Sequence, residues 1–313
     1  MLQLPAFLFQ TAIKLFQPAA LKNDLAYQLP PAISLGKQPA TERRDSLIPK
    51  RIWTYWNHEQ PDGFVMQCIQ SWQRQCPDYD VLLVHPGNLH TYVQADELPE
   101  VFHQLHPTKQ SDWLRLYLVA HHGGYWLDAS TLLTQSLDWM SQKQSKHATF
   151  LGFYLEKFTQ NQQAPVIESW ALGATAGSAF ITAWQKEFHH ALITIGTPAY
   201  LRNLQERSDW ADIRQGIQDP HYLLIHITAQ KVLRDSELQE PMALYKAEDS
   251  AYFYHYLLHW KWYFLYPQLC LIARPAAVSP IVKLRGGERR HFTEMQALHG
   301  PARPGSLWDQ ALQ

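Results

Sequence analysis

The chain has 313 residues, enough for one large domain or two small ones with a substantial core. Hydrophobic residues make up 46% and charged residues 18%, a balance typical of a globular protein and not of a disordered one. The formal net charge of −1 argues against bulk electrostatic attraction to nucleic acid, so we expect no nucleic-acid partner.

The first elements in chain order are an arm, a strand, a helix and a strand. Residues 1–47 are punctuated by prolines and show little periodicity, so we expect an N-terminal arm or linker there. The β-branched and aromatic residues of IPKRIWTYWN predict a strand. In GFVMQCIQSWQRQCP, apolar residues recur at helical spacing until Pro77, which predicts a helix. YDVLLVHP is a continuous apolar run between turn residues, typical of a strand buried on both faces.

The central part of the chain continues this alternation. The segment from Ser111 to His121 has apolar residues at helical spacing, with Ser111 or its neighbour as the expected N-cap. Gly123 and Gly124 end this helix, and YWLDAS predicts a strand that ends at Asp128. ESWALGATAG predicts a further strand, and SAFITAWQKEFHHAL predicts a helix. Strands that alternate with helices predict an α/β fold with a mainly parallel sheet flanked by helices.

Asp128 directly follows a predicted strand. A carboxylate after the apolar run Tyr125–Leu127 is costly unless something pairs with it. In open α/β sheets, ligands bind at the carboxyl ends of the strands. The position of Asp128 therefore predicts that it faces a ligand, either a metal ion or a sugar hydroxyl.

An aromatic stretch follows near the C-terminus, AYFYHYLLHWKWYFLYPQLCLIA. Polar residues and Pro267 interrupt it before it reaches the ~18 apolar residues of a transmembrane span. We expect a core helix followed by a strand, but aromatic residues also favour membrane interfaces. Peripheral membrane contact through Tyr252–Tyr266 is therefore the alternative. The first residues lack the basic segment of a secretory signal, so we expect a cytoplasmic protein, either free or at the inner face of the membrane.

The cysteines and the adjacent histidines have structural interpretations. Cys68, Cys76 and Cys270 form neither an even disulfide framework nor a CxxC metal motif, so we expect buried thiols in a reducing compartment. His121 and His122 point in different directions on a helix. We expect main-chain carbonyls at the helix end, and not a metal ion, to bind them.

Three runs carry a resemblance to a known family: IPKRIWTYW, CIQSWQRQCPDYDVLLV and SDWLRLYLVAHHGGYWLDASTLLTQSLDW. The composite S-D-x-x-R-x(7)-G-G-x-x-x-D resembles the pattern of capsular polysaccharide synthesis proteins. These are related to the family 32 glycosyltransferases, whose signature is a DXD-containing sugar-binding region. The resemblance implies a GT-A fold, a Rossmann-like nucleotide-diphospho-sugar transferase domain. We place this domain at residues 48–290, with extra C-terminal helices and a C-terminal tail at residues 291–313.

The resemblance also implies roles for the residues of the composite pattern. In such enzymes the Asp128 position binds Mn²⁺ or Mg²⁺, which bridges the diphosphate of a nucleotide sugar, and hard oxygen ligands suit these ions. The second acid of the DXD motif is Ser130 here, which would bind the metal through water or not at all. Asp112 and Arg115 would contact sugar or ribose hydroxyls of the donor. A surface salt bridge between residues three apart on a helix is the alternative.

Aromatic and basic residues outside this pattern complete the expected site. Trp56 aligns with the aromatic residue that stacks on the nucleobase in related enzymes, and Trp53 is its competitor. Glu168 to Trp170 begin a segment that shapes the donor-sugar or acceptor pocket in such transferases. The run GGERRHF could close over the diphosphate, or be a solvated basic loop. Lys283, Arg285 or His291 would supply positive charge or a metal contact there.

The sequence thus predicts a complete site. The expected catalytic residues are Asp112, Arg115 and Asp128; the expected nucleotide-sugar-binding residues are Trp53, Trp56, Asp112, Arg115, Gly124, Asp128, Ser130, Glu168 and Trp170; and the expected metal ligands are Asp128 and Ser130.

We expect a bacterial-type, hexosyltransferase-type glycosyltransferase. It would move a sugar, with a UDP-sugar as the leading donor, to a surface polysaccharide or a lipid-linked glycan. The reaction would retain the anomeric configuration and be assisted by metal. The alternative is a non-catalytic GT-A-like partner that binds a nucleotide or a glycan in a polysaccharide assembly complex.

Overall fold

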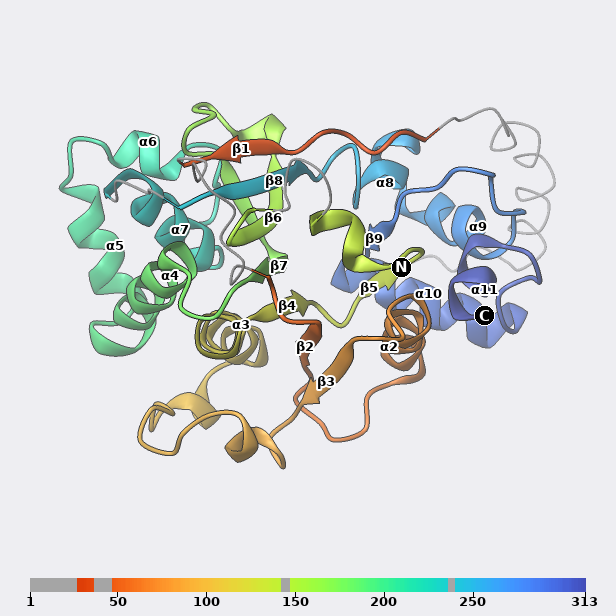
Figure 1. The fold of residues 1–313 in the computed structure, drawn as a ribbon, viewed down its shortest axis with the longest axis horizontal. Coiled ribbons are helices and arrows are strands. Elements are labelled where there is room, and N and C mark those ends of the chain that lie inside the picture. The colour runs from red at the N-terminus through yellow and green to blue at the C-terminus, as the bar shows by residue number, and fades with distance from the viewer. Residues whose placement is uncertain (1–26, 37–46, 142–146, 236–239) are drawn as a thin grey trace.

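A seven-stranded sheet forms the centre of the computed structural model, which describes residues 27–36, 47–141, 147–235 and 240–313. The strand order is β1-β8-β6-β7-β4-β2-β3 (Figure 1). The strands are β1 (Ile33–Leu35), β2 (Arg51–Tyr55), β3 (Asp80–Val84), β4 (Gly124–Leu127), β6 (Phe150–Leu155), β7 (Val166–Ala174) and β8 (Met242–Lys246). Five of these strands run in one direction, and only β1 and β7 oppose them. The sheet is therefore mainly parallel, as predicted.

Helices cover both faces of this sheet. Side chains alternate between the faces along each strand, so apolar residues of the strands lie on both faces and need cover. Ile52 and Phe153 lie in the core on one face, whereas their chain neighbours Trp53 and Tyr154 lie in the core on the other. The first face is covered by α2 (Gly63–Gln75), α8 (Phe253–Leu257), α9 (Leu265–Cys270), α10 (Gly286–His299) and α11 (Leu307–Leu312), and the second by α3 (Pro107–His122), α4 (Ala179–His189), α5 (Thr197–Gln205), α6 (Trp210–Arg214) and α7 (Leu224–Asp235). The expected α/β fold class is confirmed.

A small antiparallel sheet, β5 (Thr131–Leu133) and β9 (Ile281–Lys283), follows the end of β4. Its register pairs Thr131 with Lys283. The second sheet thus brings a segment from far along the chain beside the residues that follow β4.

Local sequence explains why α2 forms where the pattern predicts it. The side chain of Asp62 caps the helix by accepting a hydrogen bond from the N–H of Val65 at 2.9 Å. Phe64, Cys68 and Trp72 face the core. Cys68 is fully buried and free, as are Cys76 and Cys270, so the expectation of buried thiols is confirmed.

Two expectations about single elements are wrong. β3 lies at the edge of the sheet instead of being buried on both faces: Asp80 is exposed and the next three residues are only half-buried. α3 begins at Pro107, and its N-cap is His106, not Ser111. Proline suits the first turn of a helix, because the N–H that it lacks has no partner there anyway.

The expected domain boundaries also need correction. β1 lies within the expected arm but pairs with β8 at the sheet edge. At the other end, Trp308 of α11 is fully buried, and its ring lies 5.2 Å from that of Phe292 and 5.4 Å from that of Phe64. Residues 33–35 and 307–312 are therefore part of the domain, because each buries apolar surface against it. Residues 1–26 and 37–46 of the expected arm lie outside the described residues.

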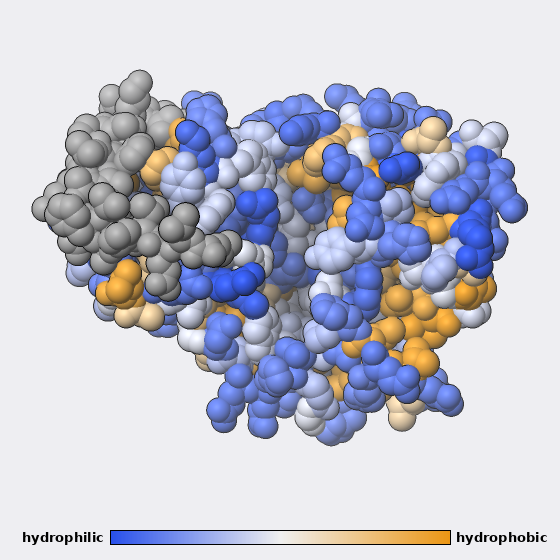
Figure 2. Space-filling model, turned by 180° about the vertical axis from the view of Figure 1, so that it is seen from behind, coloured by the Kyte–Doolittle hydropathy of each residue, from blue (hydrophilic) through white to orange (hydrophobic). Residues whose placement is uncertain are grey.

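The aromatic stretch forms α8, a turn and α9, without the strand that we expected. Trp260 in the turn is 36% exposed, and Trp262 and Tyr263 in the short 3-10 helix Trp262–Phe264 are 41% and 38% exposed. No helix in the described part of the chain is both long and apolar enough to cross a membrane. Seen from behind, the molecule is covered mostly by polar residues and is hollowed along its middle, and an apolar area lies at the lower right (Figure 2).

Candidate active site

Asp128 directly follows the carboxyl end of β4. Two glycines determine the backbone path into this strand, and β7 contacts the backbone at its far end. Gly123 and Gly124 have φ angles of 64° and 98°, in the left-handed region that favours glycine. A Cβ at Gly124 would lie 2.3 Å from Cγ of Arg51, so a larger residue would push β4 away from β2. The N–H of Asp128 donates to the carbonyl of Trp170 on β7 at 2.8 Å. The carboxylate is thus held at one end of the central strands, as predicted.

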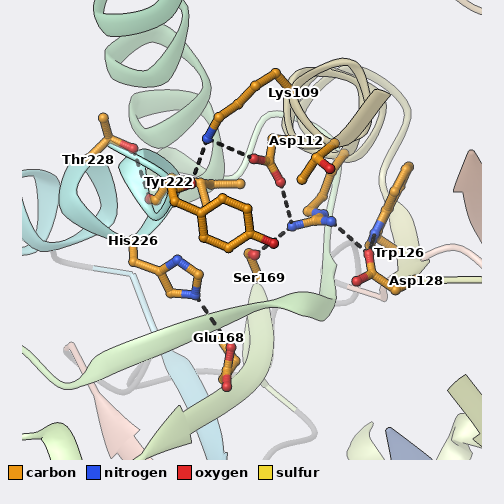
Figure 3. Close-up of polar contacts among 12 residues, drawn as sticks. Lys109, Asp112, Trp126, Asp128, Glu168, Ser169, Tyr222, His226 and Thr228 are labelled. Carbon is orange, nitrogen blue, oxygen red and sulfur yellow. Dashed lines mark hydrogen bonds and ion pairs between the residues drawn. The ribbon is translucent and has the colours of Figure 1, made fainter. Parts of the chain in front are cut away.

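A chain of ion pairs runs from α3 to Asp128 (Figure 3). The Nζ of Lys109 lies 3.5 Å from Oδ2 of Asp112, and Nη1 of Arg115 lies 3.2 Å from Oδ1 of Asp112. Arg115 also donates from Nη2 to Oδ1 of Asp128 at 2.6 Å and from Nη1 to Oγ of Ser169 at 2.5 Å. The Asp112 and Arg115 side chains are 6% and 5% exposed, which rules out the surface salt bridge. The Asp128 side chain is 26% exposed, so the chain of ion pairs meets solvent there.

Lys283 approaches Asp128 from the second sheet. Its Nζ donates to Oδ2 of Asp128 at 2.9 Å and to Oγ of Ser130 at 3.0 Å. Ser130 in turn donates to the carbonyl of Leu284 at 2.7 Å. On the other oxygen of the carboxylate, Nε1 of Trp126 donates to Oδ1 at 3.0 Å. Both oxygens of Asp128 therefore already accept hydrogen bonds from the protein.

These partners determine the charge of Asp128. Burial would by itself raise the pKa of its carboxyl, but the charges of Arg115 and Lys283 outweigh that effect. Hydrogen bonds from Lys283 and Trp126 lower the pKa further, from 3.8 to about 2. Asp128 is therefore a carboxylate at neutral pH. It can hold the two cations in place and accept a hydrogen bond from a ligand hydroxyl.

β7 brings Glu168–Trp170 to the same end of the central strands as Asp128, because β7 runs antiparallel to β4 and is longer. The pairing of the two strands ends at Leu127 and Ala171, so the earlier residues of β7 extend past the end of β4. The register of β7 with β6 also shifts here, a β-bulge of the kind found beside active sites. Oε2 of Glu168 lies 3.4 Å from Nε2 of His226 on α7 (Figure 3). The structure thus groups Glu168 with the expected residues of α3 and β4.

The three expected tryptophans differ in what they can contact. Trp53 is 1% exposed and donates to the carbonyl of Gly123 at 2.9 Å, so the expectation that it stacks on a nucleobase is wrong. Trp170 is 4% exposed, with its ring stacked on a phenylalanine, and lines the core under Asp128. Trp56 is half-buried, and the guanidinium of Arg289 lies 4.8 Å from the centre of its ring. Trp56 is therefore the tryptophan with a partly accessible face.

The remaining expectations concern histidines and the basic run. His121 and His122 each hydrogen-bond to a main-chain carbonyl, as predicted. The run GGERRHF is not a loop: it forms the first turns of α10, and Arg285 pairs with Glu288 of that helix. His291 is buried. Of the three basic residues expected near the diphosphate, only Lys283 contacts Asp128 in the described part of the chain.

Three residues of the site were not predicted: Lys109, Trp126 and His226. Lys109 precedes Asp112 by three residues on the same helix, and this spacing could have indicated the contact. Ser169 belongs to the expected pocket segment, but its contact with Arg115 was not predicted, because it depends on the antiparallel pairing of β7 with β4. No local pattern indicates His226, because α7 lies far from β7 in sequence.

The surroundings of Asp128 and Ser130 do not fit the expected Mn²⁺ or Mg²⁺. In enzymes that bind phosphates, Mg²⁺ is usually held by one or two carboxylates, with substrate phosphates and waters as its other ligands, so the carboxylate must have an oxygen to offer. Both oxygens of Asp128 are engaged, and the ammonium of Lys283 lies within 3.0 Å of both side chains. Across the described ranges, no group of three or more His, Cys, Asp or Glu side chains could hold a metal ion. The only carboxylate that the expected motif offers to a metal ion is therefore that of Asp128, whose charge Arg115 and Lys283 already neutralise.

Comparison with known proteins yields one family and several distant structures. The family model described as "Capsular polysaccharide synthesis protein" matches residues 33–262. No curated protein matches the chain. A solved structure described as "PaToxG Glycosyltransferase" is 14% identical, with 74% of this chain and 88% of that chain covered and a TM-score of 0.36. The galactosyltransferase LgtC, in complex with donor and acceptor sugar analogs, is 9% identical, with 81% and 98% covered and a TM-score of 0.36. An active-site mutant of LgtC is 12% identical, with 56% and 69% covered and a TM-score of 0.31.

Proposed function

Because the chain belongs to the capsular polysaccharide synthesis protein family, we propose that it is a glycosyltransferase of the GT-A fold. Membership in this family supports a glycosyltransferase role. The proposed reaction moves a sugar, of hexose type, from a nucleoside diphosphate sugar to a hydroxyl of a surface polysaccharide or a lipid-linked glycan. A UDP-sugar is the proposed donor.

The observation that carries this proposal is the buried chain of ion pairs Asp112–Arg115–Asp128, which opens to solvent at Asp128. Carboxylates accept hydrogen bonds from sugar hydroxyls, and a guanidinium donates in a fixed fork. Holding such groups before a ligand arrives lowers the cost of orienting a sugar. The same three residues belong to the composite pattern that resembles that of the family.

The proposed chemistry is front-face substitution with retention of configuration. The bond between the anomeric carbon and the diphosphate oxygen breaks, and its electron pair leaves with the diphosphate. The acceptor hydroxyl oxygen forms the new bond on the same face of the sugar, and its proton passes to the departing diphosphate. This route needs no covalent nucleophile from the protein. Stabilising the charge of the departing diphosphate supplies the acceleration.

Trp56 is the proposed stacking partner of the nucleobase. It follows the carboxyl end of β2, the parallel neighbour of β4, and it is partly exposed. Stacking on an aromatic ring is worth ~1–3 kcal/mol for a base. Glu168 and its partner His226 are proposed to shape the pocket for the donor sugar or the acceptor. We leave a metal ion out of the reaction, because the residues at Asp128 do not fit one.

The alternative function is a non-catalytic partner that binds a nucleotide or a glycan in an assembly complex. The engagement of both Asp128 oxygens by the protein itself favours this alternative. Turnover of any nucleotide sugar by the purified protein would eliminate it.

Thermal unfolding with a panel of nucleotides tests the proposed donor. A ligand that binds only the folded state raises the melting temperature. We expect UDP and UDP-sugars to raise it by at least ~2 °C at saturating concentration, and uridine, the matched control without phosphates, to raise it less. GDP, CDP and ADP test the other bases. The absence of a shift with every nucleotide would contradict a nucleotide-sugar donor.

We further propose that the protein acts in the cytoplasm at the inner face of the membrane, where it would meet a lipid-linked acceptor. Exposed Trp260, Trp262 and Tyr263 lie around exposed Lys261, and Arg285 lies with its guanidinium 4.8 Å from the Trp260 ring centre. Aromatic and basic side chains together suit an anionic membrane surface. Sedimentation with anionic but not neutral vesicles is the expected result, and a protein that stays in solution with both would contradict this contact.

A further inference from the structure

Lys283 stands where a divalent cation would meet Asp128 and Ser130. We propose that the ammonium of Lys283, and not a metal ion, contacts the diphosphate of the donor in this protein. The inference rests on the proposed function, because it names the group that meets the diphosphate of that donor.

The fold holds Lys283 in this position rigidly. The register of β5 with β9 places Lys283 opposite Thr131, the residue after Ser130. The backbone N–H of Lys283 also donates to the carbonyl of Ala251 at 3.1 Å. Its Nζ reaches Oδ2 of Asp128 at 2.9 Å and Oγ of Ser130 at 3.0 Å, the two side chains that the motif would offer to a metal ion.

The charges of the chain of ion pairs favour an anion over a second cation. Asp112 and Asp128 contribute two negative charges, whereas Lys109, Arg115 and Lys283 contribute three positive charges. The sum of these five side chains is +1. A divalent ion beside Asp128 would raise this sum to +3 within a mostly buried cluster, which is electrostatically costly. A diphosphate, with roughly two negative charges, would instead be attracted.

The ammonium of Lys283 also has an N–H group with which it can bind a diphosphate. A lysine ammonium has three N–H groups. In the described part of the chain, Asp128 and Ser130 accept from two of them. The Lys283 side chain is 9% exposed and that of Asp128 is 26% exposed, so a ligand can approach from the side of Asp128. The third N–H can then reach a phosphate oxygen.

In the reaction, this ammonium would act on the leaving group. As the bond between the anomeric carbon and the diphosphate oxygen breaks, negative charge grows on that diphosphate. Lys283 would stabilise it through a charge-assisted hydrogen bond while remaining protonated. The acceptor proton still passes to the diphosphate, so the atoms and electrons balance without a metal ion or a protein base.

Titration calorimetry of the wild-type protein with UDP tests this inference first. UDP is titrated in EDTA, in Mn²⁺ and in Mg²⁺, and Mn²⁺ alone is titrated into the protein. We expect the affinity for UDP to agree within about twofold in all three buffers, since the fixed ammonium replaces the ion. We also expect no saturable binding of Mn²⁺ alone. An affinity that rises about tenfold or more with Mn²⁺ would overturn the inference.

Variants at Lys283 form the second test. Lys283→Met should lower the affinity for UDP in EDTA by about tenfold or more, because a hydrogen bond to a charged group is lost, and Lys283→Arg should keep most of it. Lys231→Met is the matched control, because Lys231 is also mostly buried between two carboxylates, Glu187 and Asp235. It should leave UDP binding unchanged. Full affinity in folded Lys283→Met would overturn the inference.

These outcomes separate the inference from the proposed function. UDP binding that requires Mn²⁺, or that survives in Lys283→Met, overturns only the role of Lys283. A wild-type protein that binds no nucleoside diphosphate in any buffer overturns both.

Discussion

Replacing Asp128 by asparagine removes the negative charge that holds two buried cations together. Lys283, whose side chain is 9% exposed, then loses its counter-charge, and Arg115, whose side chain is 5% exposed, keeps only Asp112. The pKa of Asp128 is lowered from 3.8 to about 2, and one pKa unit corresponds to ~1.36 kcal/mol. The ionised carboxylate therefore contributes about 2 kcal/mol of stability relative to a neutral group.

The sign of the pH dependence follows from the direction of this shift. A carboxyl group whose pKa is lowered by folding stabilises the protein above its unfolded pKa, and the contribution is lost as the pH falls through the folded pKa. Urea unfolding of the wild-type protein and Asp128→Asn should thus differ by about 2 kcal/mol above pH 5. The difference should shrink between about pH 4 and pH 2.

Asp209→Asn is the matched control for this measurement. Asp209 also pairs with an arginine, Arg207, but their side chains are 33% and 34% exposed. Exposed ion pairs are worth ~1 kcal/mol or less, so this variant should lose less stability. A difference between wild type and Asp128→Asn that stays constant from pH 7 to pH 2, or is absent, would refute the reasoning.

Three further substitutions test the fold and the nucleotide contact. Trp308→Ala should cost ~3–5 kcal/mol in urea unfolding, because its fully buried ring would leave a cavity; a loss below ~1 kcal/mol would mean that the C-terminal helix is not part of the core. Gly124→Ala should cost more than Gly177→Ala, since both have positive φ but only at Gly124 does a Cβ meet other atoms; equal losses of ~1–2 kcal/mol would contradict this. Trp56→Ala should weaken binding of UDP about tenfold in calorimetry and, because Trp56 is only half-buried, cost less stability than Trp308→Ala; unaltered affinity would exclude stacking.

Local patterns were sufficient for the elements that build the first half of the site. The helical spacing before Gly123 and the apolar run before Asp128 placed α3 and β4, because both elements bury a face against the core. Asp112 and Arg115 were grouped with Asp128 by the resemblance to the capsular polysaccharide synthesis proteins, and not by this spacing. The direction of β7 could not be predicted, since a strand buried on both faces has the same pattern whether it is parallel or antiparallel.

Long-range pairing explains the parts of the site that sequence reasoning could not reach. Lys283 was expected near the diphosphate, as one of three basic residues, but its contact with Asp128 depends on the pairing of β9 with β5, and 155 residues separate the two side chains. The sequence left Trp53 and Trp56 as competitors for the nucleobase, because the local pattern does not show which of the two rings is exposed. The structure places Trp53 in the core under α3 and leaves Trp56 beside α10. The misfit between this site and a metal ion follows from the contact of Lys283 with Asp128 and Ser130, and no local sequence motif includes all three residues.

Release of nucleoside diphosphate from a nucleotide sugar tests the proposed activity most directly. The wild-type protein, Asp128→Asn and Asp209→Asn are compared at a temperature where each is folded, with an acceptor glycan or with water as the acceptor. We predict release by the wild type and by Asp209→Asn, and a rate at least ~100-fold lower for Asp128→Asn, because the carboxylate orients Arg115, Lys283 and the sugar. Equal release by all three proteins, or no release by the wild type with any nucleotide sugar, would contradict a glycosyltransferase acting at Asp128.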